Sequence, residues 1–523
     1  MPFTTPAITP TADPLQALIT DNAKLRAQVG ELQRRIEWFE RQIFGQKSER
    51  RIVDSDAQAQ LGLEEPPANS ADKAPAPKAR TIAPHTRRVP LQAGDGEDES
   101  GLFFDAARVP VQTIHLPAPE VEGLNVEQYE IVGEKLTHHL AQRPGSYVVL
   151  KYVRPLIKLK IAQRLVCAPA PLNVLEGSRA DVSFLAGMLV DKFAYHLPLY
   201  RQHQRLEQSG ITVSRPWLTQ CTHDAARLLE PIHAAQLASI RASRVKTMDE
   251  TPIKAARAGP GKMHTGYFWP LYGEQDEVSF LYCNSRETRH VFEALGLSPK
   301  EGAVLLTDGY AAYARYATKT GITHAQCWTH TRRGIYEAKD IEPERVGVGL
   351  DWIGKLYALE EDIRERNLRG TAKRDYRQQH AKPVVDGFFA WVNAQFEAQG
   401  LLPSNPLIKA LAYARERELG LRVYLDDPDV PIDTNHLERA LRPIPMGRRN
   451  WMFCWTELGA KFVGVLQSLI VTCKIHAIDP YTYLVDVLQR VGQHPAALVH
   501  QLTPRLWKQH FAAAPLRSRL DIN

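Results

Sequence analysis

Two acidic residues each follow a predicted strand. Asp308 comes directly after the apolar run 303–306, which is too short for a helix and typical of a buried strand, and Gly309 then ends that strand. Asp249 follows the shorter run 245–248 in the same way. We expect both acids at strand ends, facing solvent, where they could meet and hold hard divalent cations.

Glu438 is a third candidate. It lies in 435–442, which predicts a short helix that ends before Pro443. Two structural roles compete with a catalytic one. With Asn435 as N-cap, Glu438 would complete a capping box, and it can also pair with Arg442 one helical turn later. The local pattern alone favours capping over catalysis.

Together, Asp249, Asp308 and Glu438 predict a catalytic site that holds Mg²⁺, for which Mn²⁺ can substitute. Two such ions roughly 3.5–4 Å apart can activate an attacking oxygen and stabilise the leaving oxygen when a phosphodiester is cleaved or transferred. Two alternatives stay open at this point. Asp308 and Gly309 can form an ordinary turn, and Glu250 can replace Asp249 as a ligand.

Candidate DNA contacts are basic or polar residues that lie beside these acids or in the helical region before them. A charged, solvated helix face explains several of them about as well. They are Arg201, Arg205, Arg215, His330, Arg332, Arg333, Asn435, Arg439 and Arg442.

Composition is that of a soluble globular protein with several domains, since the chain has 523 residues, 44% of them hydrophobic. The formal net charge of +6 is compatible with a polyanionic partner. No apolar run has the length of a membrane span, so we expect no membrane partner and a cytoplasmic, nucleoid-associated bacterial protein. The six cysteines have no C-x-x-C spacing, so neither a disulfide framework nor a structural zinc site is indicated.

The N-terminal segment 1–51 is predicted to form a coiled coil. From Leu15 to Ile43 the apolar positions alternate spacings of three and four residues, with Asn22 at an a position, where a polar residue fixes register. This pattern favours a homo-oligomer over a helix packed on its own chain. Residues 52–110, rich in Ala, Pro, Gly and acids, predict a flexible linker.

The remaining chain predicts a multidomain α+β/α protein. Residues 111–171 form a small β unit, and 172–240 form a helical region with a helix-turn-helix pattern around Gly210. In 241–340, three antiparallel strands precede alternating helices and strands, the order of a ribonuclease-H-like catalytic core. The other parts are a helical insertion at 341–430, the last part of the core at 431–458 and a helical C-terminal domain at 459–523.

Several blocks of the sequence resemble the insertion-sequence-66 (IS66) family of bacterial DDE transposases, in the order typical of that family. The blocks are 43–50, 192–202, 248–252, 307–313, 327–333, 434–443 and 479–484. The resemblance implies that Asp249, Asp308 and Glu438 are the catalytic triad, and that 341–430 is an insertion in the catalytic core. One departure is that 121–171 keeps only Cys167 of a zinc-binding module, so no zinc is expected there.

The resemblance implies a DNA transposase that binds the inverted-repeat ends of its element and catalyses metal-dependent cleavage and strand transfer into target DNA. It also implies that accessory proteins encoded by the element can take part. Two alternatives share these features: an inactive DNA-binding regulator derived from a transposase, and a nuclease or resolvase of the same fold. A purely structural coiled-coil protein would leave the acids at the strand ends without a role.

Overall fold

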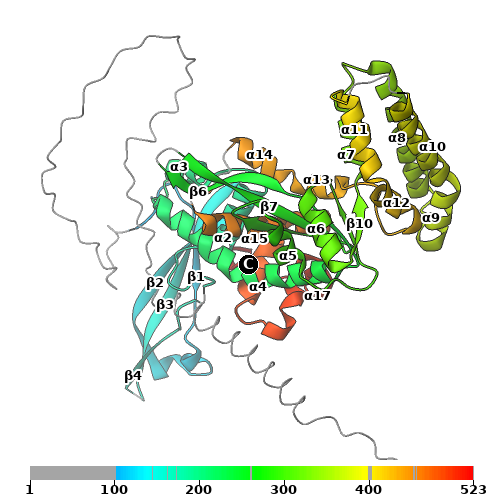
Figure 1. The fold of residues 1–523 in the computed structure, drawn as a ribbon. Helices are drawn as coiled ribbons and strands as arrows, with labels where there is room; N and C mark the ends of the chain where they lie inside the picture. The colour runs from blue at the N-terminus through cyan, green and yellow to red at the C-terminus, as the bar shows by residue number, and fades with distance from the viewer. Residues whose placement is uncertain are drawn as a thin grey trace, which may run out of the picture. The chain divides into compact units, whose positions relative to one another are not determined.

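The computed structural model describes residues 102–521, except 144, 162, 172, 260–261, 399–402, 451–453 and 455 (Figure 1). The predicted coiled coil at 1–51 lies outside the described residues, as does the predicted linker as far as residue 101. The coiled coil and the flexible linker therefore remain predictions.

The final residues of the predicted linker are packed against the folded chain. Phe103 and Phe104 are both buried. The Phe103 carbonyl also accepts a hydrogen bond from the Thr212 N–H at 2.7 Å. The folded part therefore begins before the expected boundary at residue 110, because two aromatic side chains anchor this stretch in the core.

The first sheet consists of β1 (Val111–His115), β2 (Tyr129–Arg143), β3 (Ser146–Leu159) and β4 (Arg164–Cys167). Strands β2 and β3 form an antiparallel hairpin, and β1 and β4 pair with the other edge of β3. Strand β3 is continuous over 14 residues. Its Pro155 lies between the part that pairs with β1 and the part that pairs with β4, where a missing N–H interrupts neither ladder.

Three helices follow: α2 (Val182–Phe193), α3 (Leu199–Gln208) and α4 (Arg215–Ala242). Gly210 lies between α3 and α4 with φ +86°, a left-handed conformation that glycine adopts without strain. Ser214 caps α4, because its hydroxyl accepts the Trp217 N–H at 3.3 Å. The expected pair of helices with a glycine turn is confirmed, although α4 extends much further than a recognition helix needs.

The second sheet carries the expected order of strands and helices, with one strand more than predicted. Its elements are β5 (Val245–Met248), β6 (Thr251–Gly259), β7 (Lys262–Gly273), β8 (Glu277–Cys283), α5 (Thr288–Leu295), β9 (Val304–Thr307), α6 (Ala311–Thr320), β10 (Thr323–Gln326) and α7 (Trp328–Glu337). Strands β10, β9 and β5 are parallel neighbours, and β5 pairs antiparallel with β7. Both β6 and β8 also pair with β7. The unpredicted strand, β6, follows β5 after only Asp249 and Glu250.

Alternate residues of β9 enter different cores, as a strand covered on both faces requires. Leu305 lies in a cluster with Trp269 and Tyr313. Leu306 belongs to a cluster that α7 and the following helices complete, including Trp328. Helices α5 and α6 therefore cover one face near Asp308, and α7 with the insertion covers the other.

Residues 341–430, predicted as a helical insertion and called the insertion below, form a run of helices. It contains α8 (Pro343–Glu365), α9 (Gly370–Tyr376), the π-helix η4 (Arg377–Ala381), α10 (Lys382–Glu397), α11 (Pro406–Glu416) and α12 (Glu418–Asp426). Trp328, the first residue of α7, is fully buried among these helices, and its Nε1–H donates to the Leu421 carbonyl at 2.9 Å. The helices of the insertion therefore share a hydrophobic core with α7, the helix that follows β10.

The last part of the chain is also mainly helical. It comprises α13 (Asn435–Leu441), α14 (Pro443–Asn450), α15 (Glu457–Ile475), α16 (Pro480–Arg490), the 3₁₀ helix η5 (Ala496–Leu502) and α17 (Pro504–His510); shorter 3₁₀ turns are η2 (Pro119–Val121), η3 (Val126–Gln128) and η6 (Arg519–Asp521). Within the described ranges, only α15 is long and apolar enough to cross a membrane, and 72% of its apolar window is buried in the protein. A central core helix has the same composition, and the close approach of Gly464 to Phe280 on β8 fits that role.

Candidate active site at the ends of β5 and β9

The carboxyl ends of β5 and β9 lie next to each other in the second sheet. The strands run parallel with Thr247 opposite Leu306, so Asp249 and Asp308 leave the sheet side by side. One carboxylate oxygen from each of Asp249, Glu250 and Asp308 lies within 4.8 Å of the other two. The structure therefore brings together the two aspartates expected from the sequence.

The environment of Asp249 disfavours its negative charge. Burial, followed by the charge of Glu250 and smaller contributions from Asp308 and Glu438, raises the pKa of Asp249 to about 7. The Glu250 N–H donates to Asp249 Oδ1 at 2.8 Å and opposes this shift. A bound cation would relieve the repulsion among these acids. The donor set contains only oxygens, which fits Mg²⁺ or Mn²⁺.

Glu250 is anchored by side chains of two other elements. The Tyr313 hydroxyl donates to Glu250 Oε2 at 2.6 Å, and the Arg286 guanidinium pairs with Oε1. The Glu250 side chain is only 3% exposed, and burial raises its pKa. Since these contacts already occupy Glu250, Asp249 is the better placed of the two to bind a cation.

The turn after Asp308 depends on a close approach by the insertion. The Tyr310 N–H donates to Asp308 Oδ1 at 2.9 Å, so this aspartate does shape a local turn while it faces the other acids. A Cβ on Gly309 would lie 2.5 Å from a ring carbon of Tyr413 and 2.6 Å from Arg417 Nε. Glycine is therefore needed because α11 and the residue after it pack directly against the backbone.

Glu438 lies on α13, but not in the expected capping box. The N-cap of α13 is Thr434, and Asn435 instead donates from its backbone N–H and its Nδ2 to Asp433, at 3.0 and 2.6 Å. The capping interpretation with Asn435 is thus wrong, because the Asp433 carboxylate binds that side chain. Glu438 forms a 3.5 Å contact with Arg333 Nη2 and is about one-third exposed. It lies outside the group of three acids that are within 4.8 Å of one another.

The start of α13 is joined to the start of α7. The Trp328 N–H donates to the Ile432 carbonyl at 3.1 Å, and Cys327 Sγ lies 3.3 Å from Thr434 Oγ1. The chain thus leaves the sheet for the insertion and returns from it at one place. This return brings Glu438 near Asp249 and Asp308, although the insertion separates them in sequence.

His330 and Arg333 lie on α7 close to the acids. Burial lowers the pKa of His330, and the charges of Asp308 and Glu438 are among those that oppose this shift. Its Nδ1 atom is buried without a hydrogen-bond partner among the described residues. The α7 helix therefore presents a neutral imidazole and a guanidinium to the candidate site.

The other candidate DNA contacts divide into exposed and internally bound side chains. Asn435 is bound to Asp433, as described above. Arg205 is bound as well, because it donates to the Tyr147 hydroxyl at 2.7 Å and pairs with Asp191. The remaining candidates are exposed: Arg201, Arg215, Arg332, Arg439 and Arg442. Only those on α7 and α13 share elements with the candidate active site.

Three supporting residues were not expected from the sequence. Arg286 and Tyr313 bind Glu250, and Arg417 donates to the Gly309 carbonyl at 3.2 Å. Tyr313 could have been found, since it lies on the helix that follows Asp308 and its hydroxyl can reach back. The sequence around Arg286 and around Arg417 gives no sign that either residue supports the candidate site.

Comparison with known families gives three matches along the chain. A model described as "Transposase IS66 family" matches residues 177–462, and one described as "IS66 C-terminal element" matches 468–505. A third, described as "Transposase C of IS166 homeodomain", matches 31–93. The first match includes every candidate catalytic residue.

Similar proteins occur in Sinorhizobium fredii (strain NBRC 101917 / NGR234). "Uncharacterized protein y4hP" is 30% identical over 514 residues, covering 92% of this chain and 89% of that protein. "Uncharacterized protein y4jD" is 29% identical over 404 residues, covering 72% of this chain and 76% of its own length. The similarity therefore extends across most of both chains.

Proposed function

The chain belongs to the IS66 family of transposases, and we propose that it binds the inverted-repeat ends of an insertion sequence and catalyses metal-dependent DNA cleavage and strand transfer. The observation that carries this proposal is the placement of Asp249 and Asp308 side by side at the ends of β5 and β9. Glu438 completes the proposed DDE triad from α13.

The order of the second sheet supports a ribonuclease-H-like core. The first strand, β5, lies between the antiparallel β7 and the parallel β9, and β10 follows β9 on the outside. In that fold the first and fourth strands are neighbours and carry acids at their ends. Asp249 and Asp308 have these positions if β6 is counted as the continuation of β5.

In the proposed mechanism, Asp249 and Asp308 would hold divalent cations, with Glu438 as a further ligand. Cations bound there would activate the attacking oxygen and neutralise charge at the leaving oxygen. Glu250, fixed by Arg286 and Tyr313, keeps the backbone of Asp249 in place. The Tyr310 N–H orients the carboxylate of Asp308.

DNA binding would involve several parts of the chain. The match of 31–93 to a homeodomain model supports a DNA contact from the N-terminal region. Three exposed arginines border the acids, where phosphates of a bound end would lie: Arg332 on α7, Arg439 on α13 and Arg442 directly after α13. Arg201 and Arg215 are exposed on α3 and α4 and are proposed as a further phosphate contact. Arg205 is a weaker candidate because its guanidinium binds Asp191.

The test uses labelled DNA that carries the element's own end, unlabelled target DNA, and Mg²⁺ or Mn²⁺. The native protein is expected to join the two DNAs, and Asp249→Ala and Asp308→Asn are expected to abolish cleavage while DNA binding persists. Glu301→Gln is the matched control, because this exposed acid precedes β9 at its opposite end. Substantial cleavage by Asp308→Asn would remove Asp308 from the triad.

The same assay separates the alternatives. Cleavage without joining would indicate a nuclease or resolvase. Binding without cleavage would indicate an inactive regulator or a missing accessory protein, and adding extract of cells that carry the element distinguishes these two cases.

A further inference from the structure

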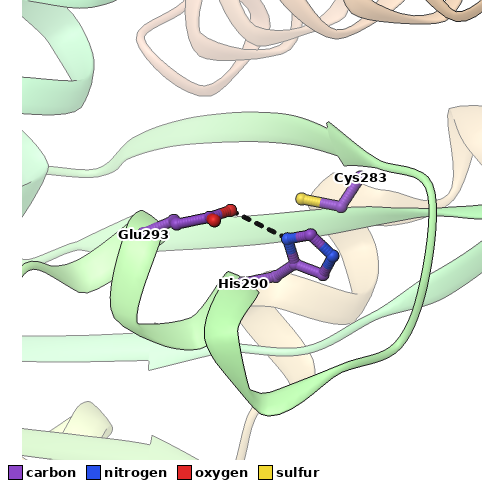
Figure 2. Close-up of side chains that lie close together, drawn as sticks. All are labelled: Cys283, His290 and Glu293. Atoms are coloured by element: carbon purple, nitrogen blue, oxygen red, sulfur yellow. Dashed lines mark hydrogen bonds and ion pairs between the residues drawn. The ribbon is translucent and has the colours of Figure 1, made fainter.

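A second group of potential metal ligands lies at the end of β8. Cys283 is the last residue of this strand, and His290 and Glu293 lie on α5 (Figure 2). One ligand atom from each residue, a sulfur, a nitrogen and an oxygen, lies within 4.8 Å of the other two. This group has no part in the proposed DNA chemistry. It is also distinct from 121–171, the stretch in which zinc ligands were expected to be lost.

The imidazole of His290 is held at both of its nitrogens. Nδ1 lies 2.8 Å from Glu293 Oε2, and Nε2 lies 2.9 Å from the Ser285 hydroxyl. Figure 2 shows Nδ1 on the side of the ring that faces the Glu293 carboxylate and the Cys283 sulfur. With its proton on Nε2, His290 donates to Ser285 and directs the Nδ1 lone pair at the other two ligands. An outer partner of this kind typically orients a metal-binding histidine.

The three ligands differ in burial, and the exposed one leaves a path by which a cation can enter from solvent. The His290 side chain is 7% exposed, whereas that of Glu293 is 63% exposed. Cys283 is half-buried. The imidazole is therefore a fixed ligand, and the glutamate is free to move by the distance that coordination requires. Ligand atoms 2.0–2.3 Å from a tetrahedral Zn²⁺ are roughly 3.3–3.8 Å apart. The 2.8 Å pair of Nδ1 and Oε2 must therefore open by about 0.5 Å, and the sulfur must approach the other two atoms by at most about 1.5 Å.

We propose that Cys283, His290 and Glu293 bind a divalent cation of the zinc class, with water in the fourth position. Thiolate, imidazole and carboxylate ligands together suit Zn²⁺ or Co²⁺, whereas Mg²⁺ binds thiolate poorly. The site therefore selects a different metal from the oxygen-only group at Asp249 and Asp308.

The location of this site assigns it a supporting role. Residues 284–287 connect β8 to α5, and they carry the Arg286 guanidinium that pairs with Glu250. The Arg286 carbonyl also accepts a hydrogen bond from the Tyr310 hydroxyl at 2.5 Å. A cation held by Cys283 and His290 would join the two ends of this loop. It would thereby hold Arg286 against Glu250, the neighbour of Asp249.

The experiment is a titration of the full-length, metal-free and untagged chain with Co²⁺. A cysteine thiolate bound to Co²⁺ gives a charge-transfer absorption in the near ultraviolet, which carboxylates at Asp249 and Asp308 cannot give. The band is expected to saturate at one equivalent. Zn²⁺ is expected to abolish the band at a similar concentration, whereas a large excess of Mg²⁺ leaves it in place.

Two variants test the ligands, and a third is a control. Cys283→Ser should remove the band, and Cys167→Ser, the matched control at another half-buried cysteine, should retain it. Glu293→Gln, at an exposed position where the fold tolerates change, should keep the band but weaken Co²⁺ binding by about tenfold or more. Circular dichroism reports whether each variant is folded. A folded native chain without the band, a band that persists in Cys283→Ser, or unchanged affinity in Glu293→Gln would each overturn the proposal.

Discussion

At the residue scale, the candidate active site is a group of acids whose negative charges are only partly compensated by the protein. Arg286 and Tyr313 stabilise Glu250, and the Tyr310 N–H stabilises Asp308. Asp249 receives a backbone N–H from Glu250 and keeps a pKa near 7. Such a site is more stable with a cation than without one. The repulsion among these acids should therefore lower the free energy of unfolding when no cation is bound.

The first prediction concerns Asp249→Asn in the absence of divalent cations. The pKa of Asp249 rises from 3.8 to about 7 on folding. The folded state therefore retains a proton that the unfolded chain loses, and stability falls as the pH rises from about 4 to 7. An amide in place of this carboxyl group does not titrate, so the variant should be the more stable protein at pH 8, by at most about 4 kcal/mol. The difference should shrink towards pH 4.

Thermal unfolding of both proteins with a chelator, at a series of pH values, measures this difference. Mg²⁺ should raise the melting temperature of the native protein more than that of Asp249→Asn. Equal melting temperatures at every pH would contradict the prediction.

The second prediction concerns Gly309→Ala. The added methyl group would overlap Tyr413 and Arg417, so either the turn that carries Asp308 or the end of α11 must move. We expect a loss of stability of about 1–3 kcal/mol and a lower rate of DNA cleavage. Chemical denaturation and the joining assay measure the two effects. Gly354→Ala on α8 is the control, because nothing lies within 4 Å of its added Cβ; similar behaviour of both variants would refute the steric explanation.

At the scale of elements, helix α13 is positioned by contacts with two strands of the sheet. His436 Nε2 lies 3.0 Å from Thr247 Oγ1 on β5, and Thr434 contacts Cys327 at the end of β10. The chain reaches α13 only after it has passed through the helices of the insertion. The packing of those helices therefore helps to place α13 beside the sheet. Arg377 on the π-helix η4 is the residue best placed to do so.

The third prediction therefore concerns Arg377→Ala. This fully buried guanidinium donates twice to Glu360 at 2.8 Å and also to three carbonyls, those of Tyr424, Asp427 and Val430. Removing it leaves the Glu360 carboxylate, which is only 14% exposed, and three carbonyls without this partner, which costs about 3–5 kcal/mol. Hydrogen exchange should show faster opening of α10 and α12, measured against Arg374→Ala, whose guanidinium is exposed. Unchanged exchange in Arg377→Ala would show that the insertion does not depend on this residue.

Sequence patterns predicted the elements around the site better than the contacts between them. The run before Asp308 is apolar and a glycine follows that aspartate, and the shorter run before Asp249 also ends at an acid, so both strand ends could be located. Strand β6 was missed because Pro252 and Lys254 give it a weak strand pattern, and its pairing with β7 supplies the missing evidence. The prediction that Asn435 caps α13 was wrong, because the Asn435 side chain donates a hydrogen bond to the Asp433 carboxylate instead.

At the scale of the whole molecule, the described part of the chain is held together by buried polar contacts between distant segments. Glu277 on β8 accepts from Ser239 on α4 at 2.5 Å and pairs with Arg505 on α17 at 3.1 Å. Asp181, the N-cap of α2, accepts from the Ser518 hydroxyl at 2.6 Å. The C-terminal helices are therefore a structural part of the folded unit that contains the site.

The fourth prediction concerns assembly. If 1–51 forms the expected coiled coil, deleting it should reduce the native oligomer to a smaller species. Light scattering coupled to size-exclusion chromatography measures the mass. Asn22→Leu tests the register at the polar a position, and it should change the number of associated chains rather than abolish association. An unchanged mass after the deletion would show that assembly uses other surfaces.

The joined entry and exit of the insertion also have an evolutionary consequence. Because Trp328 and Ile432 are hydrogen-bonded to each other, the helices between them form a cassette whose length can change without altering the separation of the flanking strand and helix. Homologous elements could exchange or enlarge this cassette at little cost to the catalytic scaffold. The contact of Arg417 with Gly309 limits that freedom, since any replacement must still supply a partner for the turn that bears Asp308.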